Sequence, residues 1–125
     1  MNTGIRSAVF GRIFAPREDW LTRAPAEEII DPGLAIVDTH HHLWRAPGHY
    51  LVDELLADTS SGHNIEATVF IECRQSYRTD GPVALRPVGE VEFVAELATK
   101  SDSDHAGKTR VAVGIVGYVT GSSRS

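Results

Sequence analysis

The sequence has few of the features that mark secreted, membrane-spanning or nucleic-acid-binding proteins. Cys73 is the only cysteine among 125 residues, so no disulfide can form within the chain, which suits a reducing compartment. No stretch approaches the roughly 20 apolar residues of a transmembrane helix, and the N-terminal residues lack the apolar core of a signal peptide. The formal net charge is −5, and no basic patch is present to neutralise phosphates. We therefore expect a cytoplasmic protein with no membrane or nucleic-acid partner.

The length and the distribution of proline indicate one modest domain with an irregular lead-in. Residues 1–33 form the expected N-terminal arm, because Pro16, Pro25 and Pro32 interrupt any regular element there. Within this arm, residues 24–30 are compatible with a single helical turn. Residues 34–119 form the expected domain, and residues 120–125 are expected to be an unstructured tail.

Apolar runs and helical periodicity alternate along the domain. Three apolar runs without polar alternation cover residues 34–37, 67–73 and 109–119. Such runs are typical of strands buried on both faces of a parallel sheet. Residues 50–61 and 87–100 place apolar side chains three and four positions apart, which predicts two amphipathic helices. The order strand, helix, strand, helix, strand predicts an α/β fold with parallel strands in sequence order and both helices on one side.

Three consecutive histidines follow the first strand in "LAIVDTHHHLW", residues 34–44. Because successive side chains of a strand point to opposite faces, we expect Asp38, His40 and His42 on one face and His41 on the other. The C-terminal ends of parallel strands are where such folds bind ligands, and neutral imidazole is a common ligand for zinc. We therefore predict a metal site at His40 and His42, in preference to a polar loop bonded to the backbone.

The stretch "IVDTHHHLW" resembles the first-strand signature of the amidohydrolase superfamily, whose members are metal-dependent hydrolases built on a TIM barrel. It is most similar to the amidohydrolase branch that contains dicarboxylate lactonases, sugar-acid lactonases and related decarboxylases. Longer stretches with the same resemblance are "REDWLTR", "YLVDELLADTSSGHNIEATVFIECRQSYRTDGP", "LRPVGEVEFV" and "TRVAVGIVG". The resemblance spans Arg17 to Gly117 and implies the N-terminal βαβαβ portion of a (β/α)8 TIM barrel.

The resemblance assigns roles to the residues of the first strand. His40 and His42 correspond to the two first-strand metal ligands, and Asp38 corresponds to the acidic residue that begins the motif. We interpret Asp38 as a group that supports the ligands from behind or anchors the strand, and His41 as structural. The implied cofactor is a divalent metal, with zinc ahead of manganese. Because some members of the branch need no metal, the resemblance leaves metal occupancy open.

Substrate contacts are expected from the segments that follow the first two strands. Glu72 closes the second strand, Arg74 follows it, and Tyr50 lies after the first strand. A guanidinium group at this edge can pair with a substrate carboxylate. The alternative for Glu72 and Arg74 is a solvated strand end and loop. Cys73 is expected to be a small buried residue rather than a nucleophile.

The implied activity is hydrolysis of a small molecule, a lactone or another cyclic ester or amide, by metal-activated water that attacks a carbonyl. A carboxylate-bearing lactone is one candidate substrate. The alternatives are a metal-dependent decarboxylase of the same branch, which is a carbon–carbon lyase, and a non-catalytic remnant or interaction module. A TIM barrel takes about 250 residues and eight strands, whereas this sequence predicts three strands. We therefore expect a truncated chain that is inactive alone and self-associates through exposed strand edges.

Overall fold

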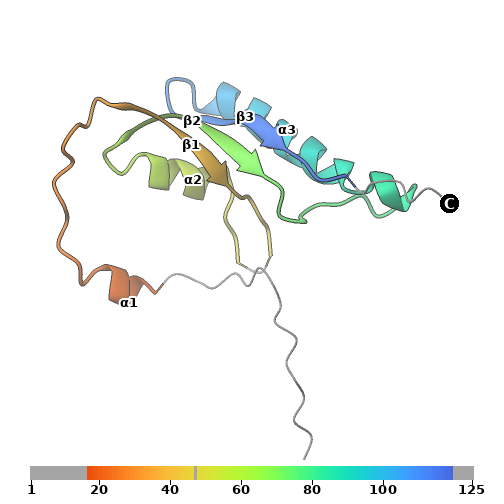
Figure 1. The fold of residues 1–125 in the computed structure, drawn as a ribbon, viewed down its shortest axis with the longest axis horizontal. Helices are drawn as coiled ribbons and strands as arrows, with labels where there is room; N and C mark the ends of the chain where they lie inside the picture. The colour runs from red at the N-terminus through yellow and green to blue at the C-terminus, as the bar shows by residue number, and fades with distance from the viewer. Residues whose placement is uncertain (1–16, 47, 120–125) are drawn as a thin grey trace, which may run out of the picture.

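Three parallel strands form the centre of the computed structural model, which describes residues 17–46 and 48–119. The strands β1 (Ala35–His41), β2 (Asn64–Ile71) and β3 (Arg110–Val116) make an open sheet in the order β1–β2–β3 (Figure 1). Both strand pairs are parallel. The predicted α/β class, strand order and parallel pairing are confirmed, although β2 begins three residues earlier than the sequence indicated.

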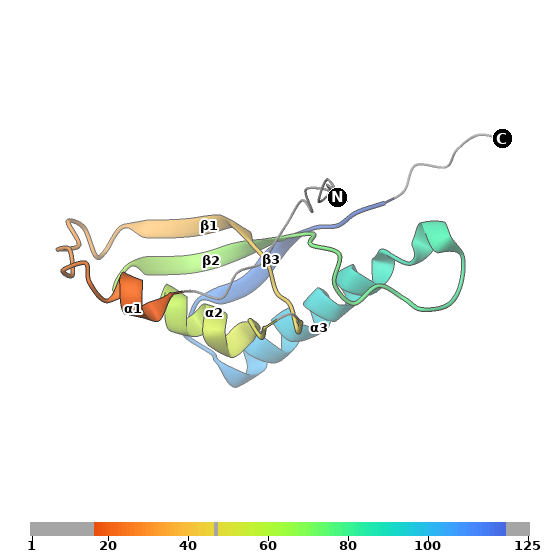
Figure 2. The ribbon, with the colours of Figure 1, turned by 90° about the horizontal axis from the view of Figure 1, so that it is seen from below.

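Two helices cover one face of the sheet. Both α2 (Val52–Thr59) and α3 (Val88–Asp104) lie on the same side of the three strands (Figure 2), as predicted. Phe70 of β2 points toward them and is fully buried, together with Leu55 of α2 and Val94 of α3. Burial of such side chains stabilises the fold by about 1.5–3 kcal/mol each. The core therefore lies between the sheet and the two helices.

The opposite face of the sheet is apolar and open. Val37 and Val116 pair with Ala67 and Ile71 of β2, which alternate with the core-facing Phe70. Val37 is 52% exposed and Val116 is 49% exposed. Within residues 17–46 and 48–119, no helix covers this face (Figure 2).

The lead-in differs from its prediction in one detail. A single turn of helix, α1, forms at Glu18–Leu21, and the turn predicted over residues 24–30 is wrong because that segment contains no helix. Glu18 and Asp19 suit the first turn of a helix, where acidic side chains complement the helix dipole. The remaining segment up to β1 is irregular, as expected. The predictions for residues 1–16 and for the 120–125 tail lie outside the described residues.

The long segment between β2 and α3 carries one further turn. It is the 3-10 helix η1 (Val83–Leu85). None of the helices in the described part of the chain is long and apolar enough to cross a membrane.

Candidate functional site

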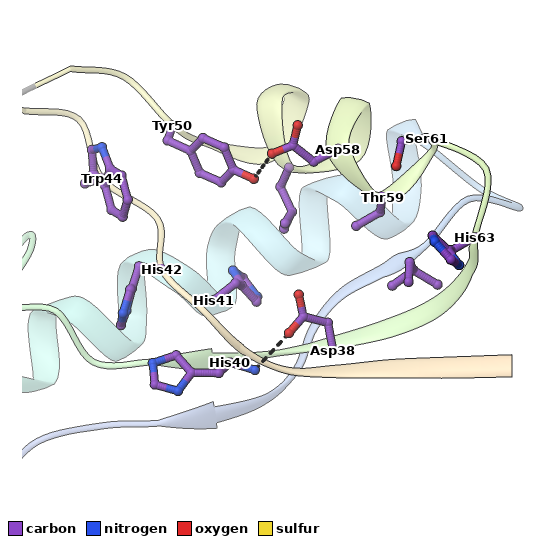
Figure 3. A pocket seen from close by; sticks show the side chains of 12 residues that line it. Asp38, His40, His41, His42, Trp44, Tyr50, Asp58, Thr59, Ser61 and His63 are labelled. Carbon is purple, nitrogen blue, oxygen red and sulfur yellow. Dashed lines mark hydrogen bonds between the residues drawn. The ribbon is translucent and has the colours of Figure 1, made fainter. Parts of the chain in front are cut away.

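A β-bulge changes which side chains share a face at the end of β1. Asp38 pairs with Thr68 and His41 pairs with Phe70, so three steps along β1 match two steps along β2. Because an extra residue reverses the alternation, Asp38 and His41 both point toward α2 (Figure 3). The prediction that Asp38 shares a face with His40 and His42 is therefore wrong.

His40 and His42 lie together on the other side of the strand (Figure 3). Their ring centroids are 5.0 Å apart, and the rings are perpendicular. The Nδ1 atom of His42 lies 2.9 Å from the carbonyl oxygen of Ile71. Because a carbonyl oxygen only accepts, Nδ1 carries the hydrogen and Nε2 keeps its lone pair. Metal-binding histidines usually have such an outer hydrogen bond, which fixes the tautomer and the ring orientation.

Asp38 bonds to the backbone of the bulge. Its Oδ1 accepts a hydrogen bond from the backbone N–H of His40 at 3.0 Å. This bond satisfies an N–H that the bulge takes out of the ladder between β1 and β2. Of the two interpretations of Asp38, the structure matches the strand anchor, while the orienting partner of His42 is the Ile71 carbonyl.

His41 connects all three strands from the core side. It is 7% exposed, and its Nε2 lies 2.9 Å from Thr68 Oγ1. The same Thr68 oxygen accepts a hydrogen bond from the backbone N–H of Ala112 at 2.9 Å. Burial lowers the pKa of His41, with the His42 backbone and Asp38 opposing the shift. These contacts match the structural role expected for His41.

A cavity of about 400 Å³ opens between β1 and α2, next to the histidines. Tyr50 lines it, and its hydroxyl donates a hydrogen bond of 2.6 Å to Asp58 Oδ2 of α2 (Figure 3). Burial, followed by this bond, raises the pKa of Tyr50 well above its ordinary value. The structure thus brings Tyr50 to the cavity that His40 and His42 also line. The other lining residues are Asp38, His41, Trp44, Leu55, Asp58, Thr59, Ser61, His63 and Ile65.

Glu72 and Arg74 follow β2 and do not line this cavity. The backbone N–H of Glu72 extends the ladder to the Val116 carbonyl at 2.9 Å. Arg74 is exposed and has a φ of 62°, in the left-handed region that non-glycine residues seldom adopt. Substrate contact by these two residues stays a prediction.

Cys73 is held as a neutral thiol. Its Sγ lies 3.6 Å from a carboxylate oxygen of Glu90 and 3.6 Å from the Leu43 carbonyl oxygen. Burial and the neighbouring Glu90 charge raise the pKa of Cys73 to about 12. A nucleophilic cysteine needs the opposite shift. Cys73 packs against the core but is only partly buried, so the predicted burial is met in part.

Glu90 of α3 organises the loop that follows β2, and its role was not predicted. Its side chain is 1% exposed and accepts hydrogen bonds from the backbone N–H groups of Cys73 and Gln75, the latter at 2.6 Å. The preceding residue, Gly89, has no side chain, which lets the loop pack directly against α3. A Cβ at this position would lie 2.6 Å from the Ser76 carbonyl oxygen. One sequence signal existed, because Glu90 lies four positions before Val94 and so shares its buried face.

No family model, curated protein or solved structure matches this chain. Within the described ranges, no group of three or more His, Cys, Asp or Glu side chains is placed to hold a metal ion. The geometry at the end of β1 therefore consists of two adjacent imidazoles, one of them oriented by a backbone carbonyl, beside a cavity of ligand size.

Proposed function

We propose that His40 and His42 are two ligands of a divalent metal, zinc ahead of manganese, in a cytoplasmic hydrolase of the amidohydrolase type. The observation that carries this proposal is the His42–Ile71 hydrogen bond, which leaves Nε2 of His42 free to ligate. The nearby ring of His40 supplies a second nitrogen. We further propose that the three parallel strands correspond to the first three of a (β/α)8 barrel. In that fold, ligands bind at the C-terminal ends of the strands, where both histidines lie.

The chain's own residues would position substrate and metal. When bound, the metal would polarise a lactone or cyclic amide carbonyl and lower the pKa of water. The Ile71 carbonyl keeps the His42 ring oriented, and Asp38 fixes the bulge that turns His40 toward it. Trp44 and Tyr50 offer apolar ring surface beside the histidines. Catalytic zinc usually has three protein ligands, so full activity would need a further ligand.

A second candidate follows from the ligand count. Two imidazoles suit a non-catalytic module that binds a metal weakly or completes its site with another chain. The absence of a third ligand among the described residues is the observation that favours it.

Cobalt substitution tests the proposed function. Cobalt(II) would be added to the purified chain, and its visible spectrum recorded before and after addition of a lactone and of the corresponding hydroxy acid. We expect the hydroxy acid, a product that can chelate, to shift the spectrum, and the shift to disappear in His42→Ala. A bound cobalt spectrum that none of these compounds changes would contradict the hydrolase and favour the non-catalytic module.

Turnover would be measured with the same lactones in the presence of zinc or manganese. We expect no hydrolysis above the metal-only blank, because the ligand set is incomplete. Hydrolysis that depends on His40 would show that two histidines suffice, and would contradict the need for a further ligand.

A further inference from the structure

The cavity beside β1 has the size of a small-molecule site and a marked chemical character. Its volume of about 400 Å³ falls within the roughly 300–1,000 Å³ of ligand pockets. Leu55 and Ile65 are its aliphatic lining residues, and the other lining residues carry carboxylates, hydroxyl groups, imidazoles and the rings of Trp44 and Tyr50. No lysine or arginine contributes to the lining in the part of the chain that the structure describes.

Aromatic rings line up along one wall. The ring centroids of His42 and Trp44 are 6.3 Å apart, and those of Trp44 and Tyr50 are 5.6 Å apart. Two backbone hydrogen bonds between Trp44 and Tyr50, of 2.9 and 3.0 Å, close the loop that carries them. The two rings are therefore held in place from both ends of the loop. Faces of Trp and Tyr attract cations through the ring quadrupole.

The carboxylates face the same space. Asp58 Oδ2 accepts the hydrogen bond from the Tyr50 hydroxyl, and Asp38 Oδ1 accepts from the His40 backbone. Both contacts use one oxygen of the carboxylate. In Figure 3, Asp38 points from β1 toward α2, and Asp58 points from α2 toward Tyr50. After burial and the Asp58 hydrogen bond, the charges of Asp58 and Asp38 also raise the pKa of Tyr50.

A buried polar atom adds an independent indication of a ligand. His41 is 7% exposed and lines the cavity. Its Nε2 is partnered by Thr68, but its Nδ1 has no hydrogen-bond partner among the described residues. A buried polar atom without a partner costs about 1–3 kcal/mol. In the tautomer that donates from Nε2 to Thr68, Nδ1 offers a lone pair to a ligand N–H.

We propose that this cavity binds a small organic cation, a primary ammonium group on an apolar body. The ammonium group would bond to Asp58, beside the Tyr50 hydroxyl, and the apolar body would rest against Trp44 and Tyr50. The proposal goes beyond the metal-dependent activity and needs no metal. An anionic ligand is disfavoured by the two carboxylates. The ammonium site does not use His40 or His42, the two cavity residues proposed as metal ligands, so its test is carried out without metal.

Isothermal titration with three benzene derivatives of similar size and different charge tests the ligand class. The metal-free chain, in EDTA, would be titrated with benzylammonium, benzyl alcohol and benzoate. We expect benzylammonium to bind at least about tenfold more tightly than benzyl alcohol, and benzoate to show no binding. Equal affinity for the alcohol, or binding of benzoate, would overturn the proposal. EDTA removes metal, so failure here leaves the His40–His42 site untouched, and failure of metal binding leaves this result untouched.

A charge-matched pair of variants tests the site. Asp58→Asn removes a carboxylate from the cavity, whereas Asp53→Asn makes the same change on α2 at a residue that does not line it. We expect Asp58→Asn to weaken benzylammonium binding at least about tenfold and Asp53→Asn to leave it unchanged. Equal effects of the two substitutions would overturn the assignment.

The two tryptophans provide a local readout that does not depend on a variant's folding. Trp44 lines the cavity, while Trp20 lies in α1 and is 61% exposed. In a ¹H–¹⁵N spectrum of the wild-type chain, benzylammonium should shift the indole N–H signal of Trp44 and leave that of Trp20 in place. An unmoved Trp44 signal, or equal shifts of both, would contradict the proposed site.

Discussion

His42, the residue that follows β1, donates a hydrogen bond of 2.9 Å from Nδ1 to the carbonyl oxygen of Ile71, the last residue of β2. The bond joins two neighbouring strands where their ladder ends. It also decides the chemistry of the imidazole, because the nitrogen that faces away from Ile71 must then carry the lone pair. A backbone carbonyl thus orients the His42 ring without any acidic partner.

The tautomer of His42 is the first prediction. In the metal-free chain at neutral pH, we expect His42 to carry its proton on Nδ1. Long-range ¹H–¹⁵N correlation spectra distinguish the two ring nitrogens by their chemical shifts. A protonated Nε2 as the major form would show that the Ile71 contact does not exist in solution.

The reactivity of Cys73 provides a pH-dependent prediction. Because the pKa of this thiol is raised from 9.0 to about 12 in the folded chain, we expect alkylation by iodoacetamide at pH 8 to be at least about tenfold slower than in urea. The unfolded chain releases the proton near pH 9 and the folded chain does not. Stability contributed by the neutral thiol is therefore present below pH 9 and is lost as the pH rises toward 12. Equal labelling rates in the folded and unfolded chains would contradict this environment.

Glu90 is predicted to be the main support of the loop that follows β2. Glu90→Ala leaves the N–H groups of Cys73 and Gln75 without their acceptor, and hydrogen bonds to charged groups contribute about 1.5–3 kcal/mol each. We expect a loss of about 2–4 kcal/mol in the free energy of unfolding, measured by urea denaturation. Glu96→Ala, at an exposed position of the same helix, should change stability by less than about 0.5 kcal/mol. Similar losses in both variants would show that Glu90 has no special role.

The three strands and the helices α2 and α3 were predictable because each buries apolar side chains in the pattern typical of its element. Apolar runs indicated the three strands, and apolar residues three and four apart, such as Leu51 and Leu55, indicated the helices. The bulge at the end of β1 was not predictable from the same pattern. The bulge depends on how Asp38 and His41 pair with β2. The sequence pattern predicts that side chains alternate strictly between the two faces of β1, whereas the pairing with β2 slips by one residue there.

The neighbours of the site residues were harder to predict than the residues themselves. The His42–Ile71 bond joins positions 29 apart in sequence, and it requires a strand register that an apolar run does not define. The Tyr50–Asp58 pair is local, but it needs the loop closed by Trp44 and Tyr50. The burial of Glu90 was also hard to predict, since a charged residue on a helix usually faces solvent. Here the carboxylate is buried and accepts hydrogen bonds from backbone N–H groups.

Self-association through the exposed edge of the sheet at β1, next to its open apolar face, is a further prediction. Val37 is 52% exposed on β1, an edge strand whose outer backbone groups have no strand neighbour in the described sheet. Edges of this kind pair readily with other chains. We expect sedimentation velocity to show species larger than a monomer that increase with concentration, and Val37→Lys to reduce them. Val83→Lys, at a 69% exposed position in η1, serves as the control and should have no effect. A wild-type chain that is monomeric at all concentrations would contradict the prediction.

Zinc binding by the two histidines tests the central claim most directly. Isothermal titration of the apo chain with zinc should show one ion per chain, with at least about tenfold weaker affinity in His40→Ala and in His42→Ala. His105→Ala, which removes a histidine at the C-terminal end of α3, should bind zinc as the wild type does. Equal zinc affinity in all four proteins, or no zinc binding by the wild-type chain, would contradict a metal site at the end of β1.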